Sequence, residues 1–168
     1  LVGSEMCIRD SNVLHLEDKV EADPDYAVTA DDIVAFEAEH GTIEPGSFVA
    51  FSSGWSTRWE DPDAFVNLDE DGVQHTPGWS LEALHVLIDD RRVAAIGHET
   101  LDTDPGVAVA ESGFLYGELY VLEQDIYQIE VLDNLAQVPA TGAVIVVGPA
   151  NIKGAPSITS RVYALFQE

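Results

Sequence analysis

Two glutamates, twelve residues apart, interrupt apolar segments of this sequence and carry side chains able to bind a metal or move a proton. Glu118 lies within GFLYGELYVLE, where apolar residues surround it at helical spacing. A carboxylate in such a stripe is costly unless a metal, an arginine or a proton pairs it. The alternative is a rotated helix in which Glu118 reaches solvent.

Glu130 lies within IYQIEVL, where strand alternation puts it on one face with Gln128. Two polar residues on one face are equally consistent with a face that lines an open cleft and with a face exposed to solvent.

The stretch AAIGHETLDTDPG places four ionisable side chains directly after a short apolar run: His98, Glu99, Asp102 and Asp104. Sites in α/β sheets gather at the carboxyl ends of strands, so His98 is a candidate for a side chain facing a cleft. For Asp102 and Asp104 we favour a turn in which the carboxylates accept hydrogen bonds from nearby backbone amides.

Aromatic residues follow another apolar run in GWSTRW, where Trp55 and Trp59 flank Arg58. Aromatic side chains in a loop can line a pocket for a flat substrate, so both tryptophans are candidate pocket residues. Packing in the core is the commoner explanation for any single tryptophan.

The elements that must position these residues alternate between helices and strands. Thr29 and Gly41 are typical of the start and end of a helix, and Ser80 is typical of a helix start. Residues 60–78, rich in acids, Pro and Gly, indicate one long loop, and residues 12–28 indicate mainly loop. The expected helices are 30–40, 81–92 and 113–123, and the expected strands are 48–51, 93–97, 126–132, 143–149 and 160–166. This order predicts an α/β fold with a largely buried sheet.

Composition limits the possible partners. The 168 residues suit one domain, and 31 acidic against 7 basic residues give a net charge of −24. Such a surface repels nucleic acid and anionic membranes, and it favours a salt-rich cytoplasm over a moderately acidic one. No apolar run approaches the roughly 20 residues that span a bilayer. The only cysteine is Cys7, which excludes an internal disulfide. Phosphate-binding glycine loops, serine nucleophile elbows and HExxH are absent.

The first residues differ in character from the acidic body. LVGSEMCIRDS resembles translated adaptor sequence found at the ends of metagenomic reading frames. We therefore expect residues 1–11 to be non-native and not to pack on the domain. Residues 12–168 are expected to form a single domain.

Several segments together resemble the cyclase family of metal-dependent hydrolases, which includes kynurenine formamidases and isatin hydrolases. FVAFSSGW is similar to a family strand that ends in Thr-Gly-Trp, and PGWS to its Pro-Gly-hydrophobic-Ser helix start. IEVLDNLAQVP is similar to the family segment that carries a glutamate metal ligand. The resemblance covers roughly residues 44–166, with the segments in the family's order and spacing.

This resemblance implies the swivelling β/β/α-type cyclase fold with a central, mostly buried mixed sheet. It implies a divalent metal, zinc or manganese, that activates water for attack on an amide. The expected substrate is N-formylkynurenine, as in tryptophan catabolism, or a cyclic amide. A cytoplasmic homo-oligomer, dimer or tetramer, that binds a small molecule is also implied.

The resemblance assigns site residues, but incompletely. Glu130 matches the family's glutamate ligand, and Glu118 stands where the family has a histidine. The family's HxGTHxDxPxH motif, with most ligands and the catalytic base, is absent, so we expect a fragment without its amino-terminal metal motif and assign no catalytic residue. The expected metal ligands are Glu118 and Glu130, and the expected pocket residues are Trp55, Trp59, His98 and Gln128. The alternative is a non-catalytic binding or scaffold member of the same fold.

Overall fold

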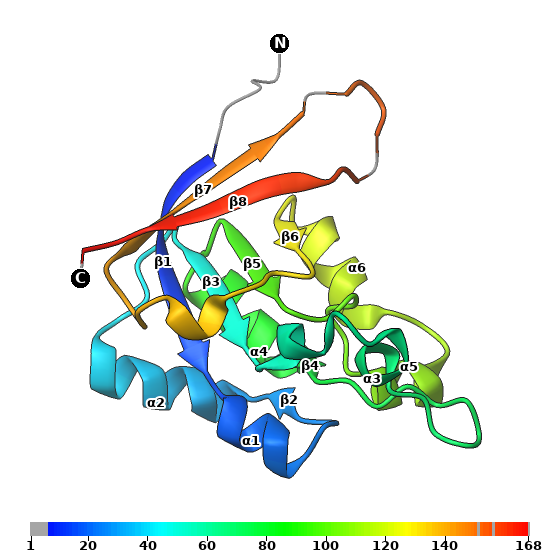
Figure 1. The fold of residues 1–168 in the computed structure, drawn as a ribbon. Helices are drawn as coiled ribbons and strands as arrows, with labels where there is room; N and C mark the ends of the chain where they lie inside the picture. Colours follow the sequence, from blue (N-terminus) through cyan, green and yellow to red (C-terminus); the bar gives the residue numbers. More distant parts are fainter. Residues whose placement is uncertain (1–6, 151, 156, 168) are drawn as a thin grey trace.

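The computed structural model describes residues 7–150, 152–155 and 157–167, and its centre is a six-stranded sheet (Figure 1). The strand order is β6-β5-β3-β1-β7-β8. The first four strands of this order are parallel, whereas β7 pairs antiparallel with β1 and β8 antiparallel with β7. The bounds are β1 Cys7–His15, β3 Phe48–Ser52, β5 Ala95–His98, β6 Tyr127–Ile129, β7 Ala143–Pro149 and β8 Ser160–Leu165. A separate parallel pair joins β2 (Ala27–Val28) and β4 (Gly78–Trp79).

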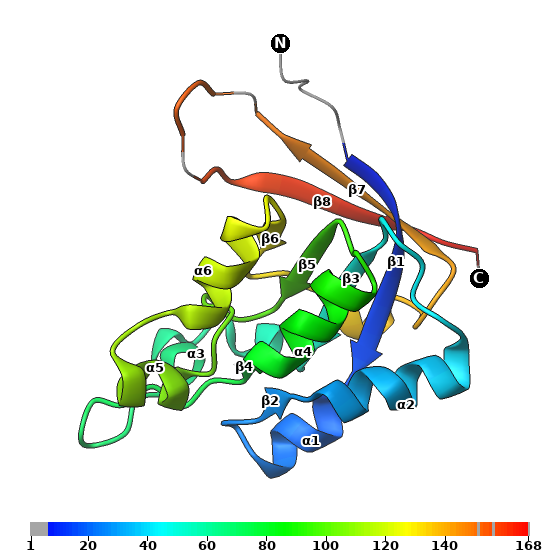
Figure 2. The same ribbon diagram turned by 180° about the vertical axis from the view of Figure 1, so that it is seen from behind.

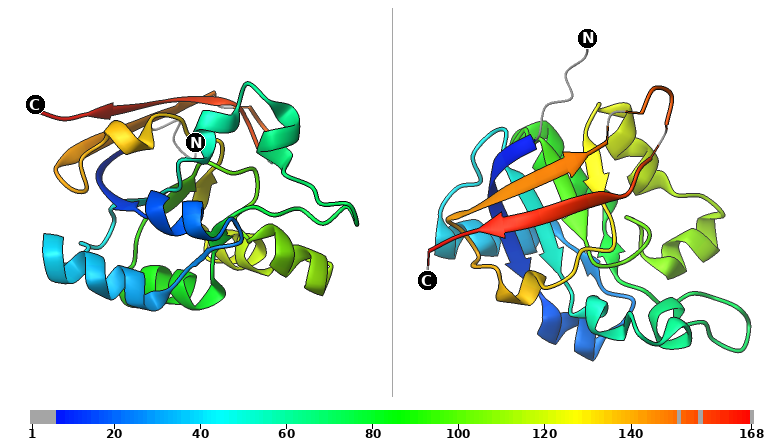
Figure 3. Two further views of the ribbon diagram at one scale, coloured as in Figure 1. Left: turned by 60° about the horizontal axis from the view of Figure 1, so that its bottom comes forward. Right: turned by 45° about the horizontal axis from the view of Figure 1, so that its top comes forward.

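Most of the helices lie against one face of the sheet, and the β7–β8 hairpin curls over the other (Figures 2 and 3). The α-helices are α1 Glu17–Ala22, α2 Ala30–His40, α3 Pro62–Val66, α4 Leu81–His85, α5 Gly106–Ser112 and α6 Tyr116–Glu123. A π-helix, η2 (Val86–Asp90), extends α4, and two 3-10 helices are η1 (Trp55–Arg58) and η3 (Leu135–Gln137). Across the described residues, no helix has the length and apolar character needed to cross a membrane.

Strand alternation divides the core into two layers. In β3, Val49 and Phe51 pack with the helices, whereas Phe48 and Ala50 pack beneath the β7–β8 hairpin. All four of these side chains are fully buried. This explains why β3 is apolar at successive positions, as expected of a strand covered on both faces.

Helix starts follow the predicted chemistry. The Thr29 hydroxyl accepts the Asp32 backbone N–H, and the Asp32 carboxylate accepts the Thr29 backbone N–H, which is a complete capping box at α2. The Ser80 hydroxyl accepts the Ala83 backbone N–H at the start of α4. Both predicted helix starts are confirmed.

The prediction for the amino-terminal part is wrong from residue 7 onward. Residues 7–11 are not apart from the domain: they pair with β7 as the first part of β1, an interior strand of the sheet, and residues 12–28 contain the rest of β1, α1 and β2. Polar residues concealed the strand, because Ser11 is buried and donates its hydroxyl to the Ala143 carbonyl oxygen at 3.1 Å. Residues 1–6 lie outside the described part of the chain, and the adaptor origin of residues 1–11 stays a prediction.

Three other element predictions need correction. The expected long loop at 60–78 contains α3, capped by the Asp61 carboxylate, and also β4. Helix α5 was not predicted. The expected strand 126–132 is shortened to β6, because Val131 adopts a left-handed φ of 54° that breaks the extended backbone.

Candidate functional site

The carboxyl ends of four parallel strands meet at one edge of the sheet (Figure 1). The segment after β3 carries the two candidate tryptophans, Glu99 follows β5, and Glu130 follows β6. This edge is where α/β sheets place their ligands, and it brings predicted site residues together from distant parts of the chain.

Four acids, which we name the carboxylate cluster, influence one another here: Asp102, Asp104, Glu118 and Glu130. Burial, followed by the charges of Glu118 and Asp102, raises the pKa of Glu130 to about 7. Burial and then the charges of Asp102 and Asp104 raise the pKa of Glu118. Burial and the Asp104 charge raise the pKa of Asp102. Like charges in a partly desolvated place produce such shifts, so the cluster would be stabilised by a cation.

Asp104 fixes the position of Glu118. Its carboxylate oxygens accept the backbone N–H groups of Gly117 at 2.7 Å and Glu118 at 2.9 Å, in the first turn of α6. A side-chain carbon at Gly117 would lie 3.1 Å from both carboxylate oxygens, so glycine permits this close approach. We expected Asp104 to bond amides nearby in its own turn, and that expectation is wrong because its partners lie thirteen and fourteen residues further along.

Gln128 joins β6 to the same region. Its side-chain oxygen accepts the Thr103 hydroxyl, and its amide nitrogen donates to the Glu118 carbonyl oxygen at 3.4 Å. Both partners belong to segments that carry the cluster. Gln128 therefore holds β6 against the start of α6, and its predicted contact with substrate stays a prediction.

A small apolar cavity, which we name the aromatic slot, lies beside the segment that follows Glu130. It has a volume of about 140 Å³ and is lined by Ser56, Trp59, Phe65, Val131, Leu132 and Asp133. The Trp59 and Phe65 rings meet edge to face at 5.3 Å, and Trp59 is 61% exposed. A cavity of about 150 Å³ with apolar walls accommodates benzene, so the slot has room for one six-membered ring.

Trp55 and His98 occupy the interior. Trp55 is fully buried, donates its indole N–H to the Phe65 carbonyl oxygen at 2.9 Å, and carries the Arg58 guanidinium 3.8 Å from its ring centre. His98 is fully buried without a hydrogen-bond partner for either ring nitrogen, and burial lowers its pKa to about 3. Neither residue lines the aromatic slot, so Trp59 alone of the candidate pocket residues does so.

The cluster suits part of a metal site. Carboxylate oxygens are ligands for Mg²⁺, Ca²⁺ and Mn²⁺, and a catalytic zinc usually has three protein ligands. Among the described residues, no group of three or more His, Cys, Asp or Glu side chains converges well enough to hold a metal ion. These residues therefore offer oxygen donors without a complete ligand set.

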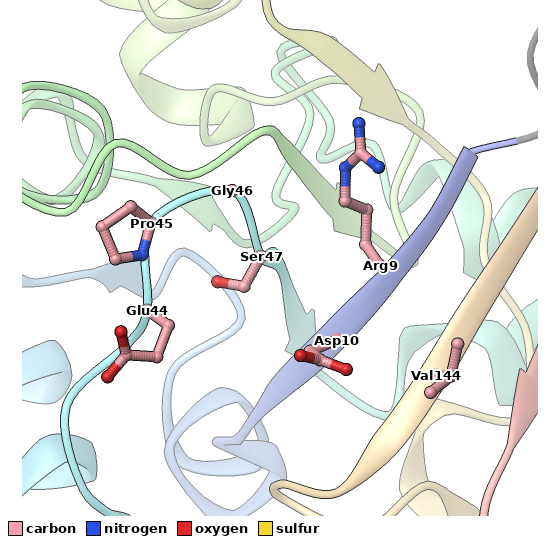
Figure 4. Close-up of a pocket in the computed structure, with 7 residues that line it drawn as sticks. All are labelled: Arg9, Asp10, Glu44, Pro45, Gly46, Ser47 and Val144. Atoms are coloured by element: carbon pink, nitrogen blue, oxygen red, sulfur yellow. The ribbon is translucent and has the colours of Figure 1, made fainter.

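A larger pocket of about 270 Å³ lies elsewhere, where the loop before β3 approaches β1 (Figure 4). Its lining residues are Arg9, Asp10, Glu44, Pro45, Gly46, Ser47 and Val144. The loop reaches the amino end of β3, away from the strand ends that carry the cluster. None of the candidate site residues lines this pocket, so it carries no part of the proposed site.

Comparison with known proteins gives consistent matches. The sequence profile of the family described as "Putative cyclase" matches residues 2–105, and so begins earlier than the resemblance noted in the sequence. The isatin hydrolase of Roseibium aggregatum is 32% identical over 154 residues, which are 92% of this chain and 58% of that protein.

Solved structures share the fold. Isatin hydrolase A from Ralstonia solanacearum has a TM-score of 0.89 at 35% identity, over 95% of this chain and 60% of that one. An isatin hydrolase bound to the product analogue thioisatinate has a TM-score of 0.92 at 30% identity, over 99% of this chain and 63% of that one. The predicted fold class is confirmed, and the chain spans less than two thirds of the length of these relatives.

Proposed function

Since this chain belongs to the cyclase family, we propose that its protein hydrolyses the carbon–nitrogen bond of a small aromatic amide with the help of a divalent metal. The observation that carries the proposal is the aromatic slot, whose wall begins one residue after Glu130 of the carboxylate cluster. A ring held in the slot would thus lie against the segment that directly follows Glu130 in the chain.

Glu118 and Glu130 are the residues proposed to contribute metal ligands. A bound divalent metal would lower the pKa of a water molecule and so supply hydroxide at neutral pH. Of zinc and manganese, manganese suits carboxylate oxygens better, and the resemblance places Glu118 where other members have an imidazole. The chain's own residues orient the site: Asp104 fixes the start of α6, and Gln128 ties β6 to it.

The proposed substrate class is a cyclic amide fused to an aromatic ring. The three similar proteins reported above are named isatin hydrolases, and the slot has room for one ring. N-formylkynurenine, with its open chain, is the second candidate. A cytoplasmic dimer or tetramer remains part of the proposal by family resemblance.

Manganese binding tests the ligand assignment directly. Titration of the chain with MnCl₂ by calorimetry should show binding that Glu118→Gln and Glu130→Gln each weaken about tenfold or more, because even the loss of a group that only orients a metal ligand weakens binding by about that much. Glu123→Gln, an exposed change on the same helix, is the matched control. Equal affinity in all four proteins would remove both glutamates from the site.

The rival is a non-catalytic member of the fold that binds small molecules without turnover. Genomic sequence upstream of Asn12 distinguishes the two. A gene that encodes HxGTHxDxPxH there, and whose product hydrolyses isatin, supports the enzyme. A gene product that binds the ring but never opens it, with any divalent metal, supports the rival.

A further inference from the structure

Glu99 is a buried carboxylate that organises the turn after β3. It is 1% exposed and lies directly after β5. One oxygen accepts the Ser53 backbone N–H at 2.8 Å, the Ser53 hydroxyl at 2.8 Å and the Trp55 backbone N–H at 3.1 Å. The other oxygen accepts the Ser56 hydroxyl at 2.8 Å. The whole turn after β3 is thus folded around a single side chain.

Ser56 connects this buried carboxylate to the aromatic slot. Ser56 lines the slot, and its only hydroxyl hydrogen is donated to Glu99. A serine hydroxyl has one donor and two acceptor lone pairs. Toward the slot, therefore, Ser56 Oγ is able to accept a hydrogen bond but not to donate one.

We propose that Glu99 is a positioning residue that holds Ser56 as an acceptor and so makes the slot select ring ligands that carry an N–H donor. The proposal rests on the proposed function, in which the slot receives the ring of an aromatic amide. An amide nitrogen attached to that ring is such a donor. A ring with oxygen at the same position would place two acceptors against each other, without a hydrogen to share.

Replacement of Glu99 by glutamine should turn Ser56 from a hydrogen-bond acceptor toward the slot into a donor. Three donors converge on one Glu99 oxygen, so the oxygen of the new amide is required there. The amide NH₂ then faces Ser56 and donates to Oγ, which frees the Ser56 hydrogen to point into the slot. The other residues that line the slot, Asp133 and the apolar side chains, do not change.

Indole and benzofuran form a matched pair of probes, because they differ only in N–H against oxygen. Their affinities are measured by NMR titration of the ¹⁵N-labelled chain, with the Trp59 indole signal as reporter. The unaltered chain should bind indole roughly two- to tenfold more tightly, as expected for one net hydrogen bond. Glu99→Gln should abolish or reverse that ratio, and Ser56→Ala should bring it close to one. Glu111→Gln, an exposed change on α5, should keep it.

The ratio of indole to benzofuran affinity distinguishes a change in the hydrogen bonding of Ser56 from a general loosening of the slot. A loosened slot would bind both probes more weakly to the same extent. If neither probe binds the unaltered chain, the slot and the proposed function fail together. If both bind but with equal affinity, or if the ratio survives in Ser56→Ala, the role of Glu99 is refuted while the slot stands. Ser56→Ala gives this answer even if Glu99→Gln does not fold.

Discussion

Asp104 has two roles that the substitution Asp104→Asn can test: its carboxylate holds the start of α6, and its charge raises the pKa of Glu118. The carboxylate accepts two backbone N–H groups at the start of α6, and asparagine has only one oxygen with which to replace them. A lost helix cap costs about 0.5–2 kcal/mol, and a hydrogen bond to a charged group contributes about 1.5–3 kcal/mol. Relief of repulsion within the carboxylate cluster offsets part of this loss. We expect the free energy of unfolding to fall by about 1–2 kcal/mol, measured by urea denaturation at pH 7.

The same substitution should lower the pKa of Glu118, because the charge of Asp104 helps to raise it. Carboxyl-carbon NMR titration measures this change. Asp102→Asn is the matched control: the Asp102 charge also raises the Glu118 pKa, but its carboxylate is not bonded to α6. It should lower that pKa without the loss of stability. Asp104→Asn with unchanged stability, or with a higher Glu118 pKa, would refute the reasoning.

Three further outcomes are expected. Because the pKa of Glu130 is raised from 4.5 to about 7, the folded chain should lose stability as pH rises through this window. Glu130→Gln should remove about 1 kcal/mol of that loss, a figure reduced for solvent screening. Urea midpoints that fall equally with pH in both proteins would contradict this. The melting temperature should rise from about 0.1 to 1 M KCl, where the Debye length falls from about 10 to 3 Å; a flat or falling series would remove the salt-adapted interpretation of the −24 charge. Residues 1–168 should release no formate from N-formylkynurenine with zinc or manganese, since three convergent ligands are not found among the described residues; metal-dependent release would overturn the partial-site interpretation.

The sequence predicted those helices and strands that depend on residues close together in the chain. Thr29 and Ser80 cap their helices as expected, because capping depends on residues within one turn. Strand β3 was predicted because a continuous apolar run suits burial on both faces. Strand β1 was missed because Ser11 is polar yet buried, and its partner is at Ala143.

In the candidate site, too, features set by local sequence were predicted and those set by distant partners were not. The twelve-residue spacing placed Glu118 and Glu130 in one region, and the Glu118 charge does raise the pKa of Glu130, although their role as ligands stays a prediction. Asp104 and Glu99 were recognised as ionisable, but their partners were not. Those partners lie on α6 and after β3, and nothing local in the sequence indicates such contacts.

The position of β1 has a consequence for how the chain folds during synthesis. The hydrogen bond from Ser11 to Ala143 joins residues 132 positions apart, and contacts of such separation are slow to form. β1 leaves the ribosome well before β7, so the edge of β1 that pairs with β7 stays open while the residues between these two strands are made. Open strand edges are where unfinished chains associate wrongly. Mutual repulsion of acidic nascent chains then provides protection against aggregation until β7 pairs with β1.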